Sequence, residues 1–211
     1  MDTATTIPAG TAALSVSDAI TQRRSVRAYT PDALPQADLD AILRDAGLAP
    51  SAWNLQPWRF VVVRDPALKT KLAAAAYQQK QVLAAPAVIV LYTDMADTLA
   101  HLDQVVRPGT TAEQGLGFRR GVENAFAGQT EAQHEAWGFA QGHIALGFLL
   151  LSAQARGYST SSMAGFDPEA VKQLLGLPAN VRVPALVAIG RGTEEGLPHH
   201  RHGHNRTARF V

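Results

Sequence analysis

The feature that most constrains the fold is a long apolar stretch in the second half of the chain. Thr130 followed by Gln133 forms a capping box, which is typical of a helix start, and no helix breaker occurs before Gly157. The pattern predicts one helix of about 26 residues, on the order of 39 Å long. From Trp137 to Leu151 it is apolar on nearly every face, which is typical of a helix buried on all sides.

One modest domain does not easily bury a helix that is apolar on every side. We therefore expect this helix to be central and to pack into a subunit interface. Gly138, Gly142 and Gly147 would let another helix approach it closely. Its polar exceptions are Gln141 and His143, and such residues are more often hydrogen-bonded core groups than ligand contacts. A ligand contact by one of the two is the alternative interpretation.

Composition excludes several classes of protein. The chain of 211 residues has 19 Lys and Arg against 18 Asp and Glu, which argues against nucleic acid or a membrane surface as its main partner. It has no cysteine, which excludes disulfides, thiolate metal sites and a cysteine nucleophile. The start of the chain lacks signal-peptide features, and the apolar run Ile144–Leu151 is far shorter than the roughly 18 residues of a membrane span. We therefore expect a cytoplasmic protein with no membrane partner.

The rest of the sequence predicts a single domain over residues 1–211 that begins with a flexible arm over 1–13. Capping residues, proline starts and apolar spacing predict further helices with short apolar strands between them. The order strand, helix, strand over 59–92 is typical of a right-handed crossover, which joins parallel strands. The expected helices begin at Ser15, Pro35, Asp65 and Asp167, and the expected strands cover 59–63, 87–92, 158–163 and 183–189.

Two further segments have more than one interpretation. Residues 95–128 are polar and rich in glycine, which is typical of a flap over a site and equally of an ordinary surface excursion. In the tail, the alternate spacing of His200, His202 and His204 could bind a divalent metal if the chain is extended. No acidic or cysteine residue lies among them, so we expect no structural or catalytic metal.

A polar loop precedes the first expected strand. Ser51, Asn54 and Gln56 can each donate and accept hydrogen bonds, and Pro57 favours an extended Gln56 as the chain enters the strand. A polar loop at the rim of a buried strand is a common way to build a site that binds a flat polar ring. A capped loop before a core strand is the simpler alternative, and this segment alone does not decide between them.

Three arginines lie close together near the start of the chain, at Arg23, Arg24 and Arg27, with Ser25 among them. Such charges repel one another unless an anion or acidic groups meet them, although a solvated basic helix end is also a common arrangement. The chain has no glycine-rich phosphate loop and no dinucleotide fingerprint. Side chains, and arginines above all, would therefore have to bind any phosphate group.

These segments occur in the order of a known family. The chain contains, in this order, RRSVRAY, PSAWNLQPWRF, QQKQ, GFDP and LPHHR, and it resembles the nitroreductase family over roughly residues 15 to 205. The resemblance implies a homodimeric flavoprotein that uses FMN and a nicotinamide donor. It also implies an α+β fold with a mixed central sheet of four to five strands flanked by helices. The long helix would lie at the dimer interface, and the C-terminal arm over 198–211 would add a strand to the partner's sheet.

The first motif, by resemblance, implies four FMN contacts. Arg23 would bind the phosphate, and Arg24 and Ser25 would contact the pyrimidine edge and the ribityl chain. Arg27 would lie near flavin N1 and O2. Because reduced flavin carries negative charge there, Arg27 would stabilise the reduced form.

The middle motifs imply contacts to the flavin ring. Gln78 and Gln81 match positions that face the pyrimidine ring, and Gln141 matches a polar position near the ring's edge. Ala164 and Gly165 resemble the residues whose backbone N–H groups approach flavin N5 and O4. No side chain in this set is expected to be catalytic, because the flavin itself carries the chemistry.

The remaining contacts imply a site shared between two subunits. Pro50, Ser51 and Asn54 resemble residues that reach the flavin bound mainly by the other subunit, and Arg201 with His199 resembles a second phosphate clamp. The expected reaction is ping-pong transfer of a hydride from NAD(P)H through flavin N5 to a nitroaromatic, a quinone or a similar electron-poor acceptor. A protein of the same fold that binds or modifies flavin without turnover is the alternative.

Overall fold

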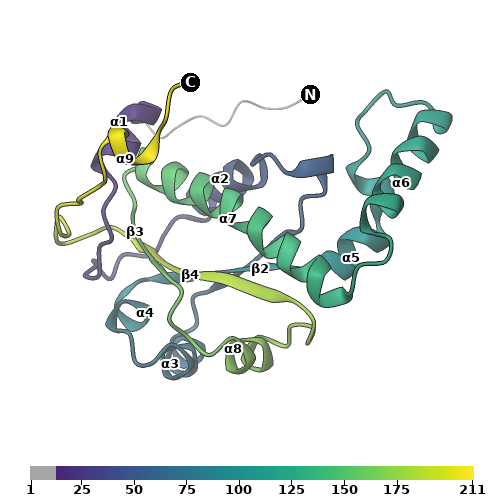
Figure 1. The fold of residues 1–211 in the computed structure, drawn as a ribbon. Coiled ribbons are helices and arrows are strands. Elements are labelled where there is room, and N and C mark those ends of the chain that lie inside the picture. The colour runs from purple at the N-terminus through teal and green to yellow at the C-terminus, as the bar shows by residue number, and fades with distance from the viewer. Residues whose placement is uncertain (1–12) are drawn as a thin grey trace.

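The computed structural model describes residues 13–211, so the predicted arm over 1–13 lies almost wholly outside the described residues. The chain forms a four-stranded sheet in the order β1-β2-β4-β3, with helices covering both faces (Figure 1). Figure 1 places α7 and α2 on one face, and α3, α4 and α8 on the other. The strands are β1 (Trp58–Val63), β2 (Ala87–Thr93), β3 (Ser159–Met163) and β4 (Arg182–Gly190).

Every neighbouring pair of strands is antiparallel, and Val90 of β2 pairs with Val61 of β1 on one side and with Leu186 of β4 on the other. The predicted parallel crossover between β1 and β2 is therefore wrong. Two helices, α3 (Pro66–Ala75) and α4 (Lys80–Ala84), fill this connection, and the chain re-enters the sheet at the end where it left. Within one chain the sheet is antiparallel rather than mixed, and a fifth strand from a partner stays a prediction.

The long predicted helix is present as α7 (Glu131–Ala155), and its capping box is confirmed. The Thr130 hydroxyl accepts a hydrogen bond from the Gln133 N–H at 3.3 Å, and the Gln133 side chain accepts one from the Thr130 N–H at 2.8 Å. One stripe of the helix is buried, and its residues are small except for one glutamate and one leucine. The buried residues are Glu135, Gly138, Gly142, Ala145, Leu149 and Ala153.

The opposite face of α7 is open in the single chain. Ile144 is 38% exposed and Phe148 is 42% exposed, so the expectation of burial on every side is wrong for one chain. By length and composition alone α7 would pass for a membrane-spanning helix, since it has 25 residues and a mean hydropathy of 1.3 over its most apolar 18-residue window. In the structure 28% of that window is buried. The glycine and alanine stripe packed on the sheet is instead typical of a core helix with a second, uncovered apolar face.

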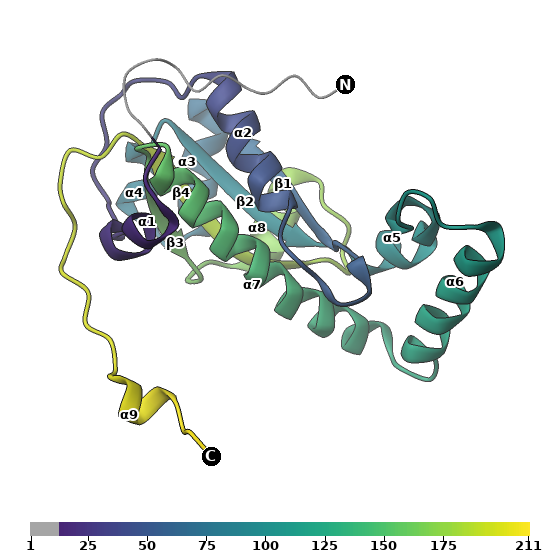
Figure 2. The same ribbon diagram turned by 90° about the horizontal axis from the view of Figure 1, so that it is seen from above.

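The segment predicted as a glycine-rich flap or surface excursion is helical. It contains α5 (Met95–Ala100), the 3-10 turn η2 (Leu102–Val105) and α6 (Ala112–Phe126). A capping box made by Thr111 and Gln114 begins α6, and Gly115, Gly117 and Gly121 lie inside that helix, while Gly109 and Gly128 lie in turns on either side of it. Figure 2 shows α5 and α6 as an arm beyond one end of the sheet. The arm has its own small core of Leu55, Met95, Leu102, Val122 and Phe126.

The other predicted helices begin within a residue of where the sequence indicates. Ser15 caps the first helix by accepting a hydrogen bond from the Asp18 N–H at 3.1 Å. The apolar residues Val16 and Ile20 of that helix do not face inward, however, because they are 71% and 56% exposed. These helices are α1 (Val16–Gln22), α2 (Gln36–Gly47) and α8 (Pro168–Leu175), while the short 3-10 turn η1 (Ala52–Asn54) lies in the polar loop before β1.

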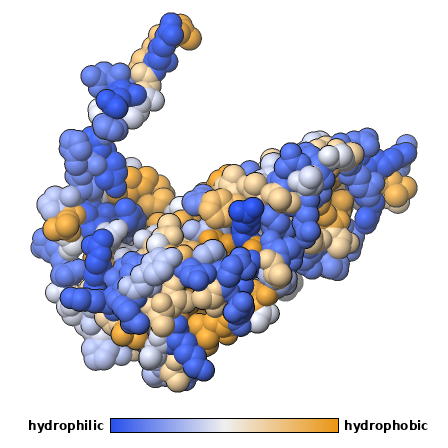
Figure 3. Space-filling model, turned by 60° about the horizontal axis from the view of Figure 1, so that its bottom comes forward, coloured by the Kyte–Doolittle hydropathy of each residue, from blue (hydrophilic) through white to orange (hydrophobic). Residues whose placement is uncertain are grey.

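The C-terminal segment projects from the body of the molecule as an arm (Figure 3). It contains the short α9 (His204–Thr207), and all of its residues from 197 onward are exposed. Three of them are apolar: Leu197 is 78% exposed, Phe210 is 89% exposed, and Val211 is fully exposed. Apolar side chains on an exposed arm are typical of a segment that packs against another surface.

The packing of α7 on the sheet predicts a sharp difference between two glycines. A Cβ added at Gly142 would lie 2.7 Å from Thr93 Cγ2 and 3.0 Å from Pro184 Cγ, while one at Gly117 of α6 would meet nothing within 4 Å. Gly142→Ala should therefore lower the free energy of unfolding by about 1–3 kcal/mol. Gly117→Ala, the matched control, should raise it by about 0.5–1 kcal/mol because alanine favours a helix. Urea unfolding of both variants measures the difference, and equal effects would contradict the close contact.

Candidate functional site

The predicted site residues gather on two separate surfaces of the chain. We call the first the anion-side surface; it follows α1, the edge strand β3, the start of α4 and the tail. We call the second the loop-side surface; it joins the loop before β1 to α7. The anion-side surface contains Arg23, Arg24, Ser25, Arg27, Gln78, Ala164, Gly165, His199 and Arg201, with Gln81 buried beneath it at 6% exposure, and the loop-side surface contains Pro50, Ser51, Asn54 and Gln141.

One end of the anion-side surface is a cluster of cations. Arg23 ends α1, and burial together with repulsion from Arg201 and Arg24 lowers its pKa. The Arg24 guanidinium donates to the carbonyl oxygens of Thr21 at 2.6 Å and of Arg23 at 2.9 Å. Within the described residues none of these three arginines forms an ion pair. Cations that converge without an acidic partner form a site for an anion.

The middle of this surface lies along the edge strand. Ser25 forms a parallel bridge with Thr160 of β3, and the Val26 N–H donates to the Thr160 carbonyl at 3.0 Å. The Arg27 N–H donates to Glu194 Oε1 at 2.8 Å, which ties this segment to the chain after β4. At roughly 3.3 Å per residue, the path from Thr160 to Gly165 is about 16 Å long. The surface is therefore long enough for a ligand with an anionic end and a distant ring.

The other end of the anion-side surface carries amide groups. Gln79 Nε2 donates to the Gly165 carbonyl at 2.6 Å, and Gln81 Nε2 donates to Gln79 Oε1 at 3.0 Å. Sequence reasoning missed Gln79, since nothing in a run of glutamines indicates which one faces the turn at Gly165. Within the described residues no hydrogen bond uses the N–H of Ala164 or Gly165. Both are exposed, so these two donors are available to a ligand.

The loop-side surface is a network of hydrogen bonds. Gln141 Oε1 of α7 accepts from the Ala52 N–H at 3.1 Å, and Ser51 Oγ accepts from the Gln56 N–H at 3.0 Å. Asn54 Nδ2 donates to the Val105 carbonyl at 3.0 Å, which joins the loop to the α5–α6 arm. These bonds bend the loop, so the predicted extended Gln56 is wrong: its φ is 47°.

The same loop lines a cavity of about 670 Å³ at the base of the α5–α6 arm. Trp53 lies over Gly121 of α6, where an added Cβ would be 3.5 Å from the ring atom Cζ3. Phe118 and Arg107 line the rest of the cavity with the loop. This concave space beside polar loop atoms has the size and chemistry of a small-molecule pocket.

Backbone strain is confined to these two surfaces. In residues 13–211 every non-glycine residue with positive φ lies either in the loop before β1 or just before α4. Such conformations cost on the order of 1–3 kcal/mol each and are typically retained where function requires them. The residues are Trp53, Asn54, Gln56, Tyr77 and Gln78.

The two surfaces lie apart within a single chain. Figure 2 places α1 and α4 toward one end of the molecule and the α5–α6 arm beyond the other. No hydrogen bond between described side chains links the residues of one surface to those of the other. For metals, no three His, Asp or Glu side chains converge anywhere in residues 13–211.

Comparison with known proteins identifies the family. The sequence model of the Nitroreductase family matches residues 20–191, and the chain belongs to that family. A Thermus thermophilus protein named NADH dehydrogenase is 49% identical over 193 residues, which cover 90% of this chain and 94% of that protein. An enone reductase of CLA biosynthesis from Lactiplantibacillus plantarum is 29% identical, with 86% of this chain and 88% of that protein covered.

A solved structure supports the same assignment. An Exiguobacterium sibiricum protein assigned to the nitroreductases, solved in complex with FMN, superposes with a TM-score of 0.85. It is 25% identical, and the alignment covers 95% of this chain and 99% of that one. The α+β fold expected from the sequence motifs is thereby confirmed.

The cation cluster predicts the titration of His199. Its pKa lies below the ordinary value of 6.5, chiefly because Arg24 lies near it, with Arg201 and Arg23 adding to the effect. The ring is therefore protonated only at a lower pH than an isolated histidine. Arg24→Gln should raise the pKa of His199 toward the ordinary value, and Arg44→Gln on α2 should leave it unchanged. NMR titration of the histidine ring protons measures both, and an unmoved pKa in Arg24→Gln would remove His199 from the cluster.

Proposed function

We propose that this chain is an FMN-dependent NAD(P)H oxidoreductase that reduces an electron-poor acceptor such as a nitroaromatic, a quinone or an enone. The observation that carries the proposal is the anion-side surface. There Arg23, Arg24, Arg201 and His199 gather at one end, and free N–H and amide groups lie at the other. The FMN bound by the Exiguobacterium sibiricum relative supports this cofactor, and the name of the Thermus thermophilus relative supports a nicotinamide donor.

The chemistry of the donor set fits FMN. A phosphate dianion without a glycine-rich loop requires planar, bidentate donors, which Arg23 and Arg201 provide. A flavin ring has acceptors at N5, O4 and O2, and the N–H groups of Ala164 and Gly165 are unused donors at the matching end. Held by these residues, FMN would supply two-electron chemistry between the nicotinamide donor and the acceptor, in a ping-pong cycle.

The residues of the chain would then bind and orient FMN and exclude water from the site. Arg27 follows Ser25 on the segment held against β3, where its positive charge would favour the reduced, anionic state of the ring. The strained turn at Tyr77 and Gln78 holds the amide end in a fixed position for a flat ring. None of these groups has to transfer a proton in the hydride step, so the contribution of the protein is positioning and charge.

We propose further that the working unit is a homodimer with two shared sites. One chain leaves apolar residues uncovered on α7, at Ile144 and Phe148, and on the C-terminal arm, at Phe210 and Val211. A second copy would cover these faces, as obligate dimers do. It would also bring the loop-side surface of one chain against the anion-side surface of the other. The α5–α6 arm and Trp53 would then border the acceptor's space.

The phosphate role of the cation cluster predicts a difference between two flavins. Arg23→Gln should weaken binding of FMN about tenfold or more, because a charged hydrogen bond to the phosphate is worth about 1.5–3 kcal/mol. Binding of riboflavin, which lacks the phosphate, should be unchanged. Arg44→Gln is the charge-matched control. Equal losses for FMN and riboflavin in Arg23→Gln, measured by fluorescence titration of the stripped protein, would contradict a phosphate contact.

A shared site predicts that two damaged chains can complement each other. Arg23→Glu damages the anion-side surface, and Asn54→Asp damages the loop-side surface, so each homodimer should bind little FMN. A mixed dimer carries one doubly damaged site and one intact site. With two affinity tags for its purification, it should regain about one FMN and half of the wild-type consumption of NADPH with a quinone.

The same experiment separates the alternatives. A mixed dimer without FMN would mean that each site is built within one chain. FMN that is bound but not reduced by anaerobic NADPH or NADH would mean a flavin-binding protein without turnover. A wild-type protein that purifies colourless and takes up no added FMN would overturn the proposal as a whole.

A further inference from the structure

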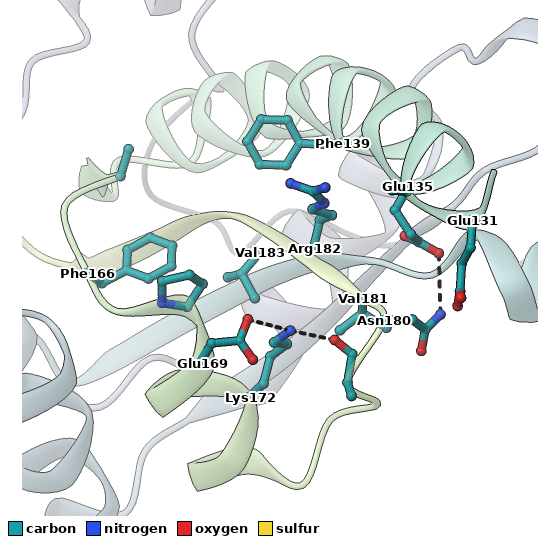
Figure 4. Close-up of a pocket in the computed structure, with 14 residues that line it drawn as sticks. Glu131, Glu135, Phe139, Phe166, Glu169, Lys172, Asn180, Val181, Arg182 and Val183 are labelled. Atoms are coloured by element: carbon teal, nitrogen blue, oxygen red, sulfur yellow. Dashed lines mark hydrogen bonds and ion pairs between the residues drawn. The ribbon is translucent and has the colours of Figure 1, made fainter. Parts of the chain in front are cut away.

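Two cavities of the chain differ in the charges that line them. The first, of about 580 Å³, lies between α7, α8 and the start of β4 (Figure 4). Acidic and basic side chains both line it, and Lys172 Nζ lies 2.8 Å from Glu169 Oε1 there. The second is the cavity of about 670 Å³ at the base of the α5–α6 arm, which we call the loop-side cavity. Within residues 13–211 its one charged lining residue is Arg107, so it offers an anion a cation without a competing carboxylate.

A tight turn holds the backbone of Arg107 in place. Pro108 and Gly109 occupy the two middle positions of the turn, and Gly109 has a φ of 82°, as a type II turn requires. Thr110 closes it, because its N–H donates to the Arg107 carbonyl at 3.2 Å and its hydroxyl donates to the same oxygen at 2.7 Å. The guanidinium takes no part in this turn, and within the described residues it forms no ion pair. An exposed arginine with a fixed backbone and no acidic partner is available to a carboxylate.

The rest of the loop-side cavity is largely apolar and includes two aromatic side chains, Trp53 of the loop and Phe118 of α6. Trp53 has a φ of 58°, a strained conformation that persists only where its surroundings fix it. Asn54 next to it donates to the Val105 carbonyl at 3.0 Å, which joins two walls of the cavity. These walls are therefore in place before a ligand arrives, and their chemistry fits a flat aromatic body.

The loop-side cavity also adjoins the proposed redox site. Pro50, Ser51 and Asn54 line it, and the same three residues are the ones proposed to reach the flavin held by the other chain. A ligand in the cavity would therefore lie beside the flavin ring in the proposed dimer. This is the place of an electron acceptor rather than of a remote effector.

We propose that the acceptor at this site is an electron-poor aromatic compound that carries a carboxylate group. Its carboxylate accepts hydrogen bonds from the Arg107 guanidinium, and its ring packs against Trp53 and Phe118. The inference rests on the proposed function, because it names the class of acceptor for the same redox site. For a nitroaromatic acceptor, one NAD(P)H and one proton reduce the nitro group to a nitroso group and release one water.

The first test measures binding without turnover, on the full-length protein saturated with FMN so that the flavin phosphate occupies the cation cluster. Its probes are 2-naphthoate and 2-naphthamide, which have nearly the same shape and differ in charge, and neither is an electron acceptor. In isothermal titration calorimetry 2-naphthoate should bind about fivefold more tightly, the size expected of an ion pair open to solvent. This preference should shrink as the salt concentration rises, because salt screens exposed charges.

Three variants assign the contact. Arg107→Gln should bind the two naphthyl probes about equally, and Arg107→Lys, which keeps the charge without the planar donors, should retain part of the preference. Arg182→Gln is the matched control, since it removes an exposed arginine from the lining of the other cavity, and it should bind as the wild type does. The melting temperature of each variant shows that it is folded, so a loss of binding is not a loss of structure.

The second test compares two acceptors, 4-nitrobenzoate and 4-nitrobenzamide, with NADPH as the donor. Arg107→Gln should lower the ratio of kcat/KM for the benzoate to that for the benzamide about fivefold. The change should appear in KM and not in kcat, because the carboxylate contact is the same before and during reduction. Comparing the ratio between wild type and variant cancels the different intrinsic reactivity of the two compounds.

Failure of this inference differs from failure of the proposed function. Equal binding of both naphthyl probes to the wild type, or a preference removed by Arg182→Gln and not by Arg107→Gln, would overturn the carboxylate contact. If both nitro compounds are reduced with a ratio that Arg107→Gln leaves unchanged, the proposed function stands and this inference is wrong. If neither nitro compound nor a quinone is reduced, the proposed function is wrong, and the acceptor role of the cavity is wrong with it.

Discussion

The close contact between α7 and the sheet is the interaction on which the rest of the structure depends. Gly142 lets α7 approach β2 and β4 so closely that an added Cβ would lie 2.7 Å from Thr93 Cγ2, and Gly138 lets it approach the start of α5, where an added Cβ would lie 2.6 Å from Met95 Cγ. This contact positions Gln141 next to the loop before β1 and Glu135 next to the start of α5. It also leaves the second apolar face of α7 exposed, where a second chain could pack against it.

The elements of the fold were largely predictable, and their arrangement was not. The capping box at Thr130 and the proline start at Pro66 are local signals, and both helices begin where those signals place them. The direction of β2 is not a local property, because it depends on how two helices return the chain to the sheet. The helix α6 was not predicted because its glycines suggest turns, although the capping box of Thr111 and Gln114 is a local signal of its start.

For the site, the family resemblance already separated the loop residues Pro50, Ser51 and Asn54 from the phosphate residues, but it grouped Gln141 with the ring contacts of the other set, whereas the structure joins Gln141 to the loop at Ala52. Motif order identified Arg23 and Arg201, and the structure brings these distant residues into one cluster. The sequence could not show that Gln79 rather than its neighbours bonds Gly165, or that Gln56 departs from an extended conformation, because both follow from strained local geometry. Nothing in the sequence indicated that Glu135 is buried, because one acidic residue in a helix is ordinary.

The arm formed by α5 and α6 has a core of its own, in which Val122 and Phe126 pack against Leu55 and Leu102 rather than against the sheet. Substitutions, insertions and deletions there disturb few contacts of the main core. This part of the chain is therefore free to diverge rapidly during evolution while the sheet changes slowly. Since the same arm lines the cavity beside Trp53, the shape of that cavity can differ among related proteins without refolding the scaffold.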